Sequence, residues 1–214
     1  MAQHVKRHYR SHRRREQAEQ TRARVIDAAE TVFRERGYER ASVSAIAAGA
    51  GVADETIYAH FANKRTLLGE LVQGAVRGSD PRPVPEQDTP RALTALSDQS
   101  EQLRLFAVDI AQRLERSGPL VAVVREGAAG EPELADLLDR LHADRLRNLR
   151  TLTRALRANG PLRLKDDAAT ETIWALTSPE LHQLLTRQRS WSRRRYANWL
   201  AESLEAMLLP PVDT

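Results

Sequence analysis

Apolar residues recur every three or four positions along most of the 214-residue chain. This spacing is typical of amphipathic α-helices, and no segment shows the strict alternation of apolar and polar residues that marks a half-buried β-strand. Glycine and proline separate the helical segments, chiefly at Gly37, Gly51, Pro119 and Pro161. The sequence therefore predicts an all-α fold of about nine helices, in a chain long enough to bury a hydrophobic core.

The composition excludes several classes of protein. The chain has no cysteine, so it has no disulfides, no thiolate nucleophile and no cysteine-based zinc site. No apolar run reaches the ~18 residues that a membrane helix needs, and the basic N-terminus is not followed by the apolar stretch of a signal peptide. We therefore expect a cytoplasmic protein without a membrane partner.

Motifs of common enzyme classes are also missing from the sequence. There is no glycine loop that ends in Lys-Ser or Lys-Thr, no HExxH and no GxSxG. We predict no enzymatic activity, no catalytic residues and no cofactor. A hydrolase or transferase site assembled in space from Asp, Glu and His stays open as an alternative, because a motif search does not see it.

Basic residues are concentrated at the N-terminus. The chain carries a formal net charge of +4, but residues 1–15 contain six basic residues and no acidic one. These residues are Lys6, Arg7, Arg10, Arg13, Arg14 and Arg15. We predict a basic disordered arm over residues 1–15 that binds a polyanion, with Arg13, Arg14 and Arg15 as candidate DNA contacts. A solvated tail without a function is the alternative.

Three histidines of this arm, His4, His8 and His12, would share one face of a helix. Imidazoles at this spacing can bind a metal ion, but no carboxylate accompanies them and the surrounding positive charge repels cations. We predict no metal site. The expected consequence is added positive charge in mildly acidic solution.

Two short helices joined by a tight turn are expected within residues 42–61. Ser42 can cap a helix that ends near Gly49, Gly51 supplies the turn, and a second short helix runs from Ala53 to His60. This arrangement is characteristic of a helix-turn-helix, although an ordinary helical hairpin in a core has the same spacing. A longer helix precedes the pair, from about Arg15 to Arg36, and another follows it with Asn63 as a candidate cap.

Residues 42–68, SVSAIAAGAGVADETIYAHFANKRTLL, resemble the DNA-binding domain of the TetR (tetracycline repressor) family. The upstream segment from Val25 to Tyr38, with Ala28-Ala29, Phe33 and Gly37, resembles the first helix of that family. The match covers about residues 20–70, and nothing comparably sharp covers residues 75–165. The resemblance implies an N-terminal three-helix DNA-binding domain followed by a C-terminal helical domain that binds a ligand and dimerises.

The resemblance also implies roles for individual residues. Tyr58 and His60 would donate to DNA phosphates at the rim of the recognition helix, and Lys64 would bind a phosphate at the start of the next helix. The remaining candidate DNA contacts face the major groove or lie within reach of it, and they are Ser42, Ser44, Asp54, Glu55, Thr56 and Ala59.

Two features of the recognition helix depart from the family pattern or from simple attraction to phosphate. The family usually has Ser or a similar cap where this chain has Ala53, so Asp54 caps one residue later or the helix begins more loosely. Asp54 and Glu55 repel phosphates unless one caps the helix and the other accepts from a cytosine amino group. We expect the basic arm to compensate for this repulsion.

A proline-rich stretch, residues 79–90, is predicted to connect a DNA-binding domain of residues 16–78 with a ligand-binding and dimerisation domain of residues 91–214. Helices of the second domain are expected at about 91–116, 120–128, 132–158, 166–186 and 192–209. Ser178-Pro179 either kinks the helix in which it lies or ends it, with Ser178 as the cap of a new one.

The resemblance implies an apolar ligand cavity among the central helices, although each residue also suits a plain core position. The candidates are Leu103, Phe106, Ile110, Val124, Leu141 and His142. In the family, the last two helices pair with a second copy of the chain as a four-helix bundle, although they could instead complete the core of one chain. The candidate interface residues are Ile173, Trp174, Leu181, Leu185, Trp199, Leu200 and Met207.

These observations predict a homodimeric transcriptional regulator whose partners are double-stranded DNA with a palindromic operator and a small-molecule effector of unknown identity. Repression of a nearby gene, relieved by the effector, is the expected direction. The alternative is a helical protein-interaction module in which the helix-turn-helix is only structural.

Overall fold

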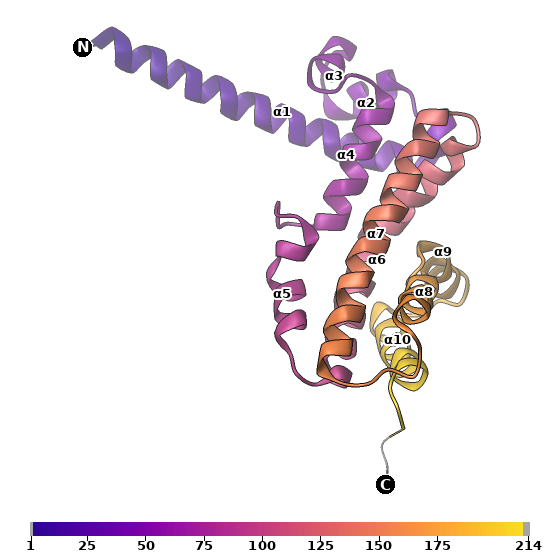
Figure 1. Cartoon of the computed structure of the whole chain (residues 1–214). Coiled ribbons are helices and arrows are strands. Elements are labelled where there is room, and N and C mark those ends of the chain that lie inside the picture. The colour runs from indigo at the N-terminus through magenta and orange to yellow at the C-terminus, as the bar shows by residue number, and fades with distance from the viewer. Residues whose placement is uncertain (1, 212–214) are drawn as a thin grey trace. The chain divides into compact units, whose positions relative to one another are not determined.

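The computed structural model describes the backbone of residues 2–211 and the side chains of residues 15–211. Over this range the chain forms ten α-helices, a 3-10 turn and a π-helical turn, without a β-strand, which confirms the predicted all-α class (Figure 1). No helix in the described range is long and apolar enough to cross a bilayer. The chain divides into two compact units, Met1–Leu71 and Val72–Thr214.

The first unit contains α1 (Ala2–Arg40), α2 (Val43–Ala50), α3 (Asp54–His60) and the first half of α4 (Lys64–Arg77). Helix α1 is interrupted at Gly37, whose φ of 69° lies in the left-handed region, as the sequence predicts. Its helical backbone includes residues that we expected to form a disordered arm. No Gly or Pro precedes Gly37, and Arg, Gln, Glu and Ala all favour helix, which explains the difference.

The core of the first unit comes from the predicted apolar stripe of α1. Val25, Ala29 and Phe33 have no exposed surface, and they share the buried interior with residues of the other three helices. Helix α2 lies close to α1, since a Cβ added to Gly49 would come within 3.3 Å of the Cβ of Ala28. Small residues in α2 are thus required by the packing as well as by the turn.

The second unit is built around one long helix, α6 (Gln99–Ala128), which packs against α5, α7, α9 and α10. The other elements are the 3-10 turn η1 (Val84–Glu86), α5 (Asp88–Ala95), α7 (Pro132–Asn159), α8 (Asp166–Leu176), α9 (Pro179–Gln183), the π-helical turn η2 (Leu184–Gln188) and α10 (Arg193–Leu208). Their buried faces form one apolar core that includes Leu103, Leu156, Ile173 and Leu200.

Three predicted helix boundaries in this unit are wrong. Helix α5 begins inside the stretch expected as a connector, because Pro90 stands in its first turn, where the missing N–H is not needed. Helix α6 begins at Gln99, where the Asp98 side chain accepts from the Glu101 N–H at 2.8 Å. It then continues through Pro119, since Gly118 and Leu120 are buried against neighbouring helices and packing outweighs one lost hydrogen bond.

The segment around Ser178-Pro179 forms two helices and not a kinked one. Helix α8 ends at Leu176, and the Ser178 side chain accepts from the Leu181 N–H at 3.1 Å. Pro179 stands at the first position of α9, where its fixed φ favours a helix start. The second of the two expected alternatives is therefore the one observed.

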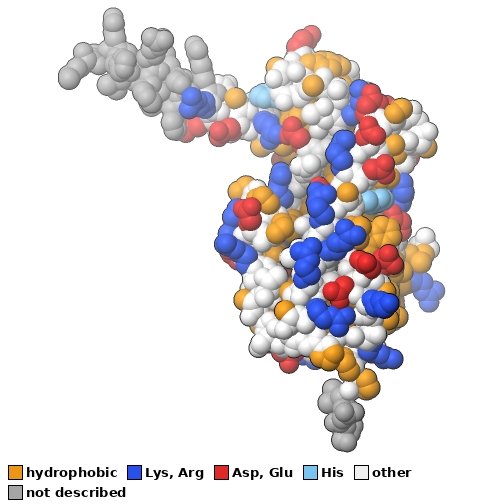
Figure 2. Space-filling view, in the orientation of Figure 1, with side chains coloured by type: hydrophobic (Ala, Val, Ile, Leu, Met, Phe, Trp, Pro, Cys, Tyr) orange, Lys and Arg blue, Asp and Glu red, His pale blue; other side chains and the backbone are white. Residues whose placement is uncertain are grey.

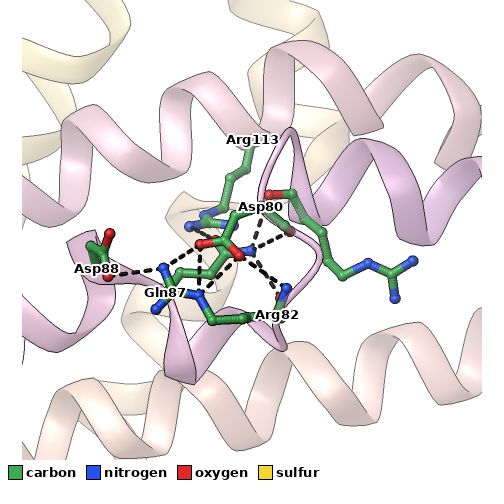
Figure 3. A network of polar contacts seen from close by, with 6 residues as sticks. Asp80, Arg82, Gln87, Asp88 and Arg113 are labelled. Atoms are coloured by element: carbon green, nitrogen blue, oxygen red, sulfur yellow. Dashed lines mark hydrogen bonds and ion pairs between the residues drawn. The ribbon is translucent and has the colours of Figure 1, made fainter.

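A buried polar network joins the end of α4, the segment after it, and the middle of α6 (Figure 3). The amide nitrogen of Gln87 donates to three carbonyl oxygens, those of Arg77, Asp80 and Arg82, at 3.0 to 3.1 Å. Arg113 of α6 donates to the Asp109 carboxylate at 2.7 Å, to the Val76 carbonyl at 2.9 Å and to Gln87 Oε1 at 2.9 Å.

The surface side of this network is an ion pair of Arg82 with Asp80 and Asp88 (Figure 3). Hydrogen bonds from the Arg82 side chain and N–H lower the pKa of Asp80, and the two carboxylates raise the pKa of Arg82. Together these contacts satisfy the carbonyl groups at the C-terminus of α4, which no helical N–H reaches.

Candidate nucleic-acid interface

Helices α2 and α3 are joined by a tight turn of defined geometry. Gly51 adopts a left-handed conformation, with φ 65° and ψ 41°, and its N–H donates to carbonyl groups of α2. The N–H of Val52 donates to the Ala47 carbonyl at 3.0 Å, which closes the turn. Of the residues of α3, only Ile57 is buried, so the rest of the helix surface is free to contact a partner.

The side chains on this surface are those that the family resemblance predicts to contact DNA. Tyr58 is 56% exposed, Glu55 and Ala59 are also exposed, and Thr56 and His60 are half-buried. Helix α3 contains no Lys or Arg, and Figure 2 shows acidic and hydrophobic side chains where it reaches the surface. Lysine or arginine charge that attracts phosphate must therefore come from outside this helix.

Asp54 does not cap α3. Its carboxylate accepts a hydrogen bond of 2.6 Å from the Ser44 hydroxyl of α2, while Ala53 occupies the cap position without a side-chain hydrogen bond. The looser of the two expected helix starts is thus observed. The Ser44–Asp54 bond connects the two helices of the motif, and Glu55 is the exposed acidic residue of α3.

We predict that this bond stabilises the motif. Ser44→Ala and Asp54→Asn should each lower the free energy of unfolding by about 1 kcal/mol, because a net hydrogen bond contributes on that scale. In a double-mutant cycle by urea denaturation, the two changes should show a coupling energy of similar size. Glu55→Gln is the control and should leave stability unchanged; a coupling energy of zero would show that the bond does not order the motif.

Lys64, the candidate phosphate ligand on α4, is held by α1. Its ammonium group donates to the Tyr38 carbonyl at 3.0 Å and lies 3.9 Å from the centre of the Tyr38 ring. One of the three N–H donors is thereby used, and two remain for a phosphate. Asn63 caps α4 as expected, since its side chain accepts from the Thr66 N–H at 2.9 Å.

The remaining DNA candidates lie at the edges of the motif. Ser42 caps α2, since its hydroxyl oxygen accepts from the Ala45 N–H at 3.1 Å, and its own hydrogen is left as a donor. Arg15 is exposed on α1. The side chains of Arg13 and Arg14, and those of the three arm histidines, lie outside the part of the chain that the structure describes.

The six residues predicted to line a ligand cavity pack in or against the core of the second unit. Leu103 and Val124 have no exposed surface, Phe106 is buried, and Ile110, Leu141 and His142 are half-buried. A surface hollow of about 410 Å³ lies elsewhere in the unit, and its lining residues are Arg163, Leu164, Thr172, Ala206 and Met207. Leu103, Phe106 and Val124 are thus buried positions of α6, whereas Ile110, Leu141 and His142 keep some exposed surface. The ligand cavity stays a prediction.

The residues predicted to form a dimer interface fall into two groups. Ile173 and Leu200 are fully buried within the unit, so they belong to the core of one chain, which is the other possibility for these helices. Met207 is 48% exposed, and four residues are half-buried, namely Trp174, Leu181, Leu185 and Trp199. These five leave surface that a second chain could cover.

The end of α8 carries a polar arrangement that motif spacing did not reveal. Arg145 of α7 donates through one nitrogen, Nη2, to the carbonyl of Trp174 and to the Thr177 hydroxyl, the latter at 2.9 Å. Its guanidinium carbon lies 4.9 Å from the centre of the Trp174 ring. Burial lowers the pKa of Arg145 to about 10. Arg145 therefore caps α8 from a neighbouring helix.

Tyr196 of α10 serves the same helix end, since its hydroxyl donates to the Leu176 carbonyl at 3.0 Å. His182 of α9 stands edge-on to the Tyr196 ring, with ring centres 4.8 Å apart. Burial raises the pKa of Tyr196 and lowers that of His182. These residues come from separate helices, so no sequence motif could have grouped them, and only the fold brings them together.

Comparison with known proteins finds a match to a described family within the first unit. Residues 25–71 match the family model "Bacterial regulatory proteins, tetR family". The chain is 45% identical over 60 residues to the HTH-type transcriptional regulator TtgR of Pseudomonas putida, covering 28% of this chain and 29% of that protein. It is 32% identical over 125 residues to the HTH-type transcriptional repressor BepR of Brucella suis, covering 52% and 59%.

Likeness to a solved structure extends over both units. NalD, the secondary repressor of the MexAB-OprM multidrug efflux pump in Pseudomonas aeruginosa, is 25% identical with a TM-score of 0.67, covering 90% of this chain and 98% of that one. The sequence alignments span less than a third of TtgR and under two thirds of BepR. The first unit is thus similar in sequence, and the second mainly in fold.

Proposed function

This chain is a member of the TetR family of bacterial regulatory proteins, and from that premise we propose that it is a transcriptional regulator that binds DNA and responds to a small molecule. One observation carries the proposal: α3 buries only Ile57 and presents Glu55, Tyr58 and Ala59, within the residues that match the family model. An internal packing helix would bury a wider face.

We assign the contacts by chemistry. Tyr58, His60 and the free donors of Lys64 bind phosphates, and the arm residues, Arg13, Arg14 and Arg15 among them, follow the backbone. Glu55 accepts from a cytosine amino group, and Thr56 and Ala59 approach base edges in the major groove. Ser42 and Asp54 act mainly inside the motif, since the first caps α2 and the second binds Ser44.

The working form is a homodimer. Two copies of α3 would enter successive major grooves of a palindromic operator, with half-sites ~34 to 36 Å apart. The half-buried and exposed apolar residues of α8, α9 and α10 supply the surface through which two chains pair, in the manner of a four-helix bundle.

Ligand response requires a state that fits DNA and one that does not, with the ligand favouring one of them. Helix α4 begins in the first unit, and its last carbonyls are bound by Arg113 and Arg116 of α6. A ligand that displaces α6 would therefore displace the end of α4. Release of a repressor by the ligand is the direction we propose, and the similarity to BepR and NalD, which are both repressors, supports it.

Selection of bound sites from random DNA by the purified full chain tests this function. We expect palindromic sites whose two halves lie one helical turn of DNA apart. The double variant Tyr58→Phe, Lys64→Ala should bind the selected site at least about tenfold more weakly, because both subunits then lack two donors to phosphate. Lys165→Ala, which removes an exposed lysine of the second unit, is the charge-matched control.

Each part of the proposal has an outcome that would contradict it. Full affinity of the double variant would remove the phosphate roles of Tyr58 and Lys64. Failure to select any sequence would overturn the regulator itself and favour the alternative, a helical interaction module. Sedimentation should show that the variant remains a dimer, so that weaker DNA binding cannot be ascribed to dissociation.

A further inference from the structure

Hydrogen-bonding groups without partners gather where α8 meets α9. The buried atoms concerned are Nε of Arg145, both ring nitrogens of His182 and the amide nitrogen of Gln183, and none has a partner among the described residues. Buried polar groups are almost always hydrogen-bonded, so such a group calls for a ligand, water or ion. Three residues of this kind within one helix junction indicate a place for an acceptor.

The hydrogen bonds by which Arg145 caps α8 do not use all the N–H donors of its guanidinium. The two contacts with the end of α8 both use Nη2, and Nε is left over. Arg145 forms no ion pair with a described acidic side chain, whereas the buried Arg113 pairs with Asp109 at 2.7 Å. Arg145 is half-buried, but its Nε is shielded from water. A shielded donor of a cation without a counter-charge is costly, and an anion that reaches it recovers that cost.

The surroundings of Arg145 are aromatic. Trp174 lies against its guanidinium, and His142 stands edge-on to Trp174 with ring centres 6.0 Å apart. Tyr196 also binds the end of α8, through the Leu176 carbonyl, and His182 stands against the Tyr196 ring. A molecule bound here would therefore meet donors at one end and aromatic faces along its body.

The backbone of this junction is irregular. Helix α8 stops at Leu176, α9 has only five residues, and the π-helical turn η2 follows it directly. Single π-helical turns are concentrated at functional sites, because they re-aim side chains at the cost of regular hydrogen bonds. Both His182 and Gln183 precede this turn immediately.

We propose that Arg145 and His182 hold the acidic group of the effector, and that the effector is a carboxylate with an apolar or aromatic body. The carboxylate accepts from Nε of Arg145, and the body lies against the half-buried ring of Trp174. One unpartnered Nε–H donor suits the single negative charge of a carboxylate better than a phosphate dianion. This inference rests on the proposed function in one respect, namely that the second unit is the effector domain of a regulator.

The binding step is tested on the full chain without DNA. Titration with benzoate and with decanoate, each up to its solubility limit, should shift the Nε–H resonance of Arg145 in proton–nitrogen correlation spectra. The resonance is assigned by its disappearance in Arg145→Lys, which keeps a charge to cap α8. Benzyl alcohol and decanol, which lack the acid, should not shift it. No shift with either acid would overturn the proposal.

Calorimetry on variants tests the role of Arg145 in affinity. Arg145→Gln should weaken binding of the acid that shifts the resonance by at least about tenfold, since a charge-assisted bond is removed. Arg145→Lys should fall between this variant and the natural chain. Arg154→Gln, an exposed arginine of the same helix, is the control and should bind normally. If Arg145→Gln does not fold, Arg145→Lys and His182→Gln are compared with the natural chain instead. If both variants bind the acid as tightly as the natural chain, the assignment is refuted.

Failure of this inference can be told apart from failure of the proposed function. DNA binding is measured by fluorescence anisotropy on the selected operator, with and without the acid. A chain that binds operator but shows no acid-dependent shift at Arg145 keeps its function and loses the carboxylate site. A chain that binds the acid through Arg145 but selects no DNA keeps the site and loses the regulator.

Discussion

Replacement of Arg113 by methionine will lower the free energy of unfolding by about 3 to 5 kcal/mol, the cost of removing one partner from a buried ion pair. The side chain of Arg113 is only 8% exposed and that of Asp109 17%, so water cannot take the place of the guanidinium. Gln87 and the Val76 carbonyl lose a donor at the same time. Urea denaturation followed by circular dichroism measures the decrease in stability.

Arg104→Met is the matched control for this prediction. Arg104 lies on the same helix and pairs with Glu205 at 3.2 Å, but its side chain is 63% exposed. Exposed ion pairs contribute about 0 to 1 kcal/mol, so this variant should stay within about 1 kcal/mol of the natural chain. Similar decreases in both variants would show that burial does not set the strength of the Arg113 network.

Replacement of the six basic arm residues by glutamine will flatten the salt dependence of operator binding. Each phosphate that the arm no longer neutralises should reduce the slope of log K against log salt by about 0.9, because fewer counterions are released from the DNA. Because the surface of α3 is acidic, we expect the arm to be the main source of attraction, and affinity at low salt should fall by orders of magnitude. Glutamine preserves helix propensity and isolates the charge.

A control with the same change in charge elsewhere completes this experiment. The control variant replaces six exposed arginines of the second unit, namely Arg91, Arg140, Arg150, Arg154, Arg189 and Arg194. Their replacement by glutamine should change the slope far less, since only distant, screened charge is removed. An unchanged slope in the arm variant would show that the arm binds no phosphates.

Local patterns predicted the first unit well. The stripe of Val25, Ala29 and Phe33 is buried, Gly51 makes the turn, and Ser42 and Asn63 cap their helices. Each of these features depends on residues within one or two turns of helix, where spacing and propensity suffice. The course of α6 in the second unit was harder to predict. Pro119 locally disfavours a continuous helix, but the burial of its neighbours keeps α6 helical through it.

The contacts that define the sites involve residues far apart in the sequence. Lys64 binds the Tyr38 carbonyl 26 residues away, and Arg113 binds Gln87 at the same separation. Arg145 reaches Thr177, 32 residues along the chain. The sequence does not show which charged residue of a helix will have such a distant partner, because a solvated arginine and a buried one cannot be distinguished by local pattern.

The sequence by itself determined the all-α class, the helix-turn-helix and the side chains that α3 can present to DNA, because helical periodicity, caps and turns are local properties. Only the tertiary structure decided that Asp54 binds Ser44 in place of capping α3, that Ile173 and Leu200 face the core, and that Nε of Arg145 lies buried without a partner among the described residues. The reason is physical. Burial and hydrogen-bond partners depend on which helices meet, and that is fixed by packing over the whole chain.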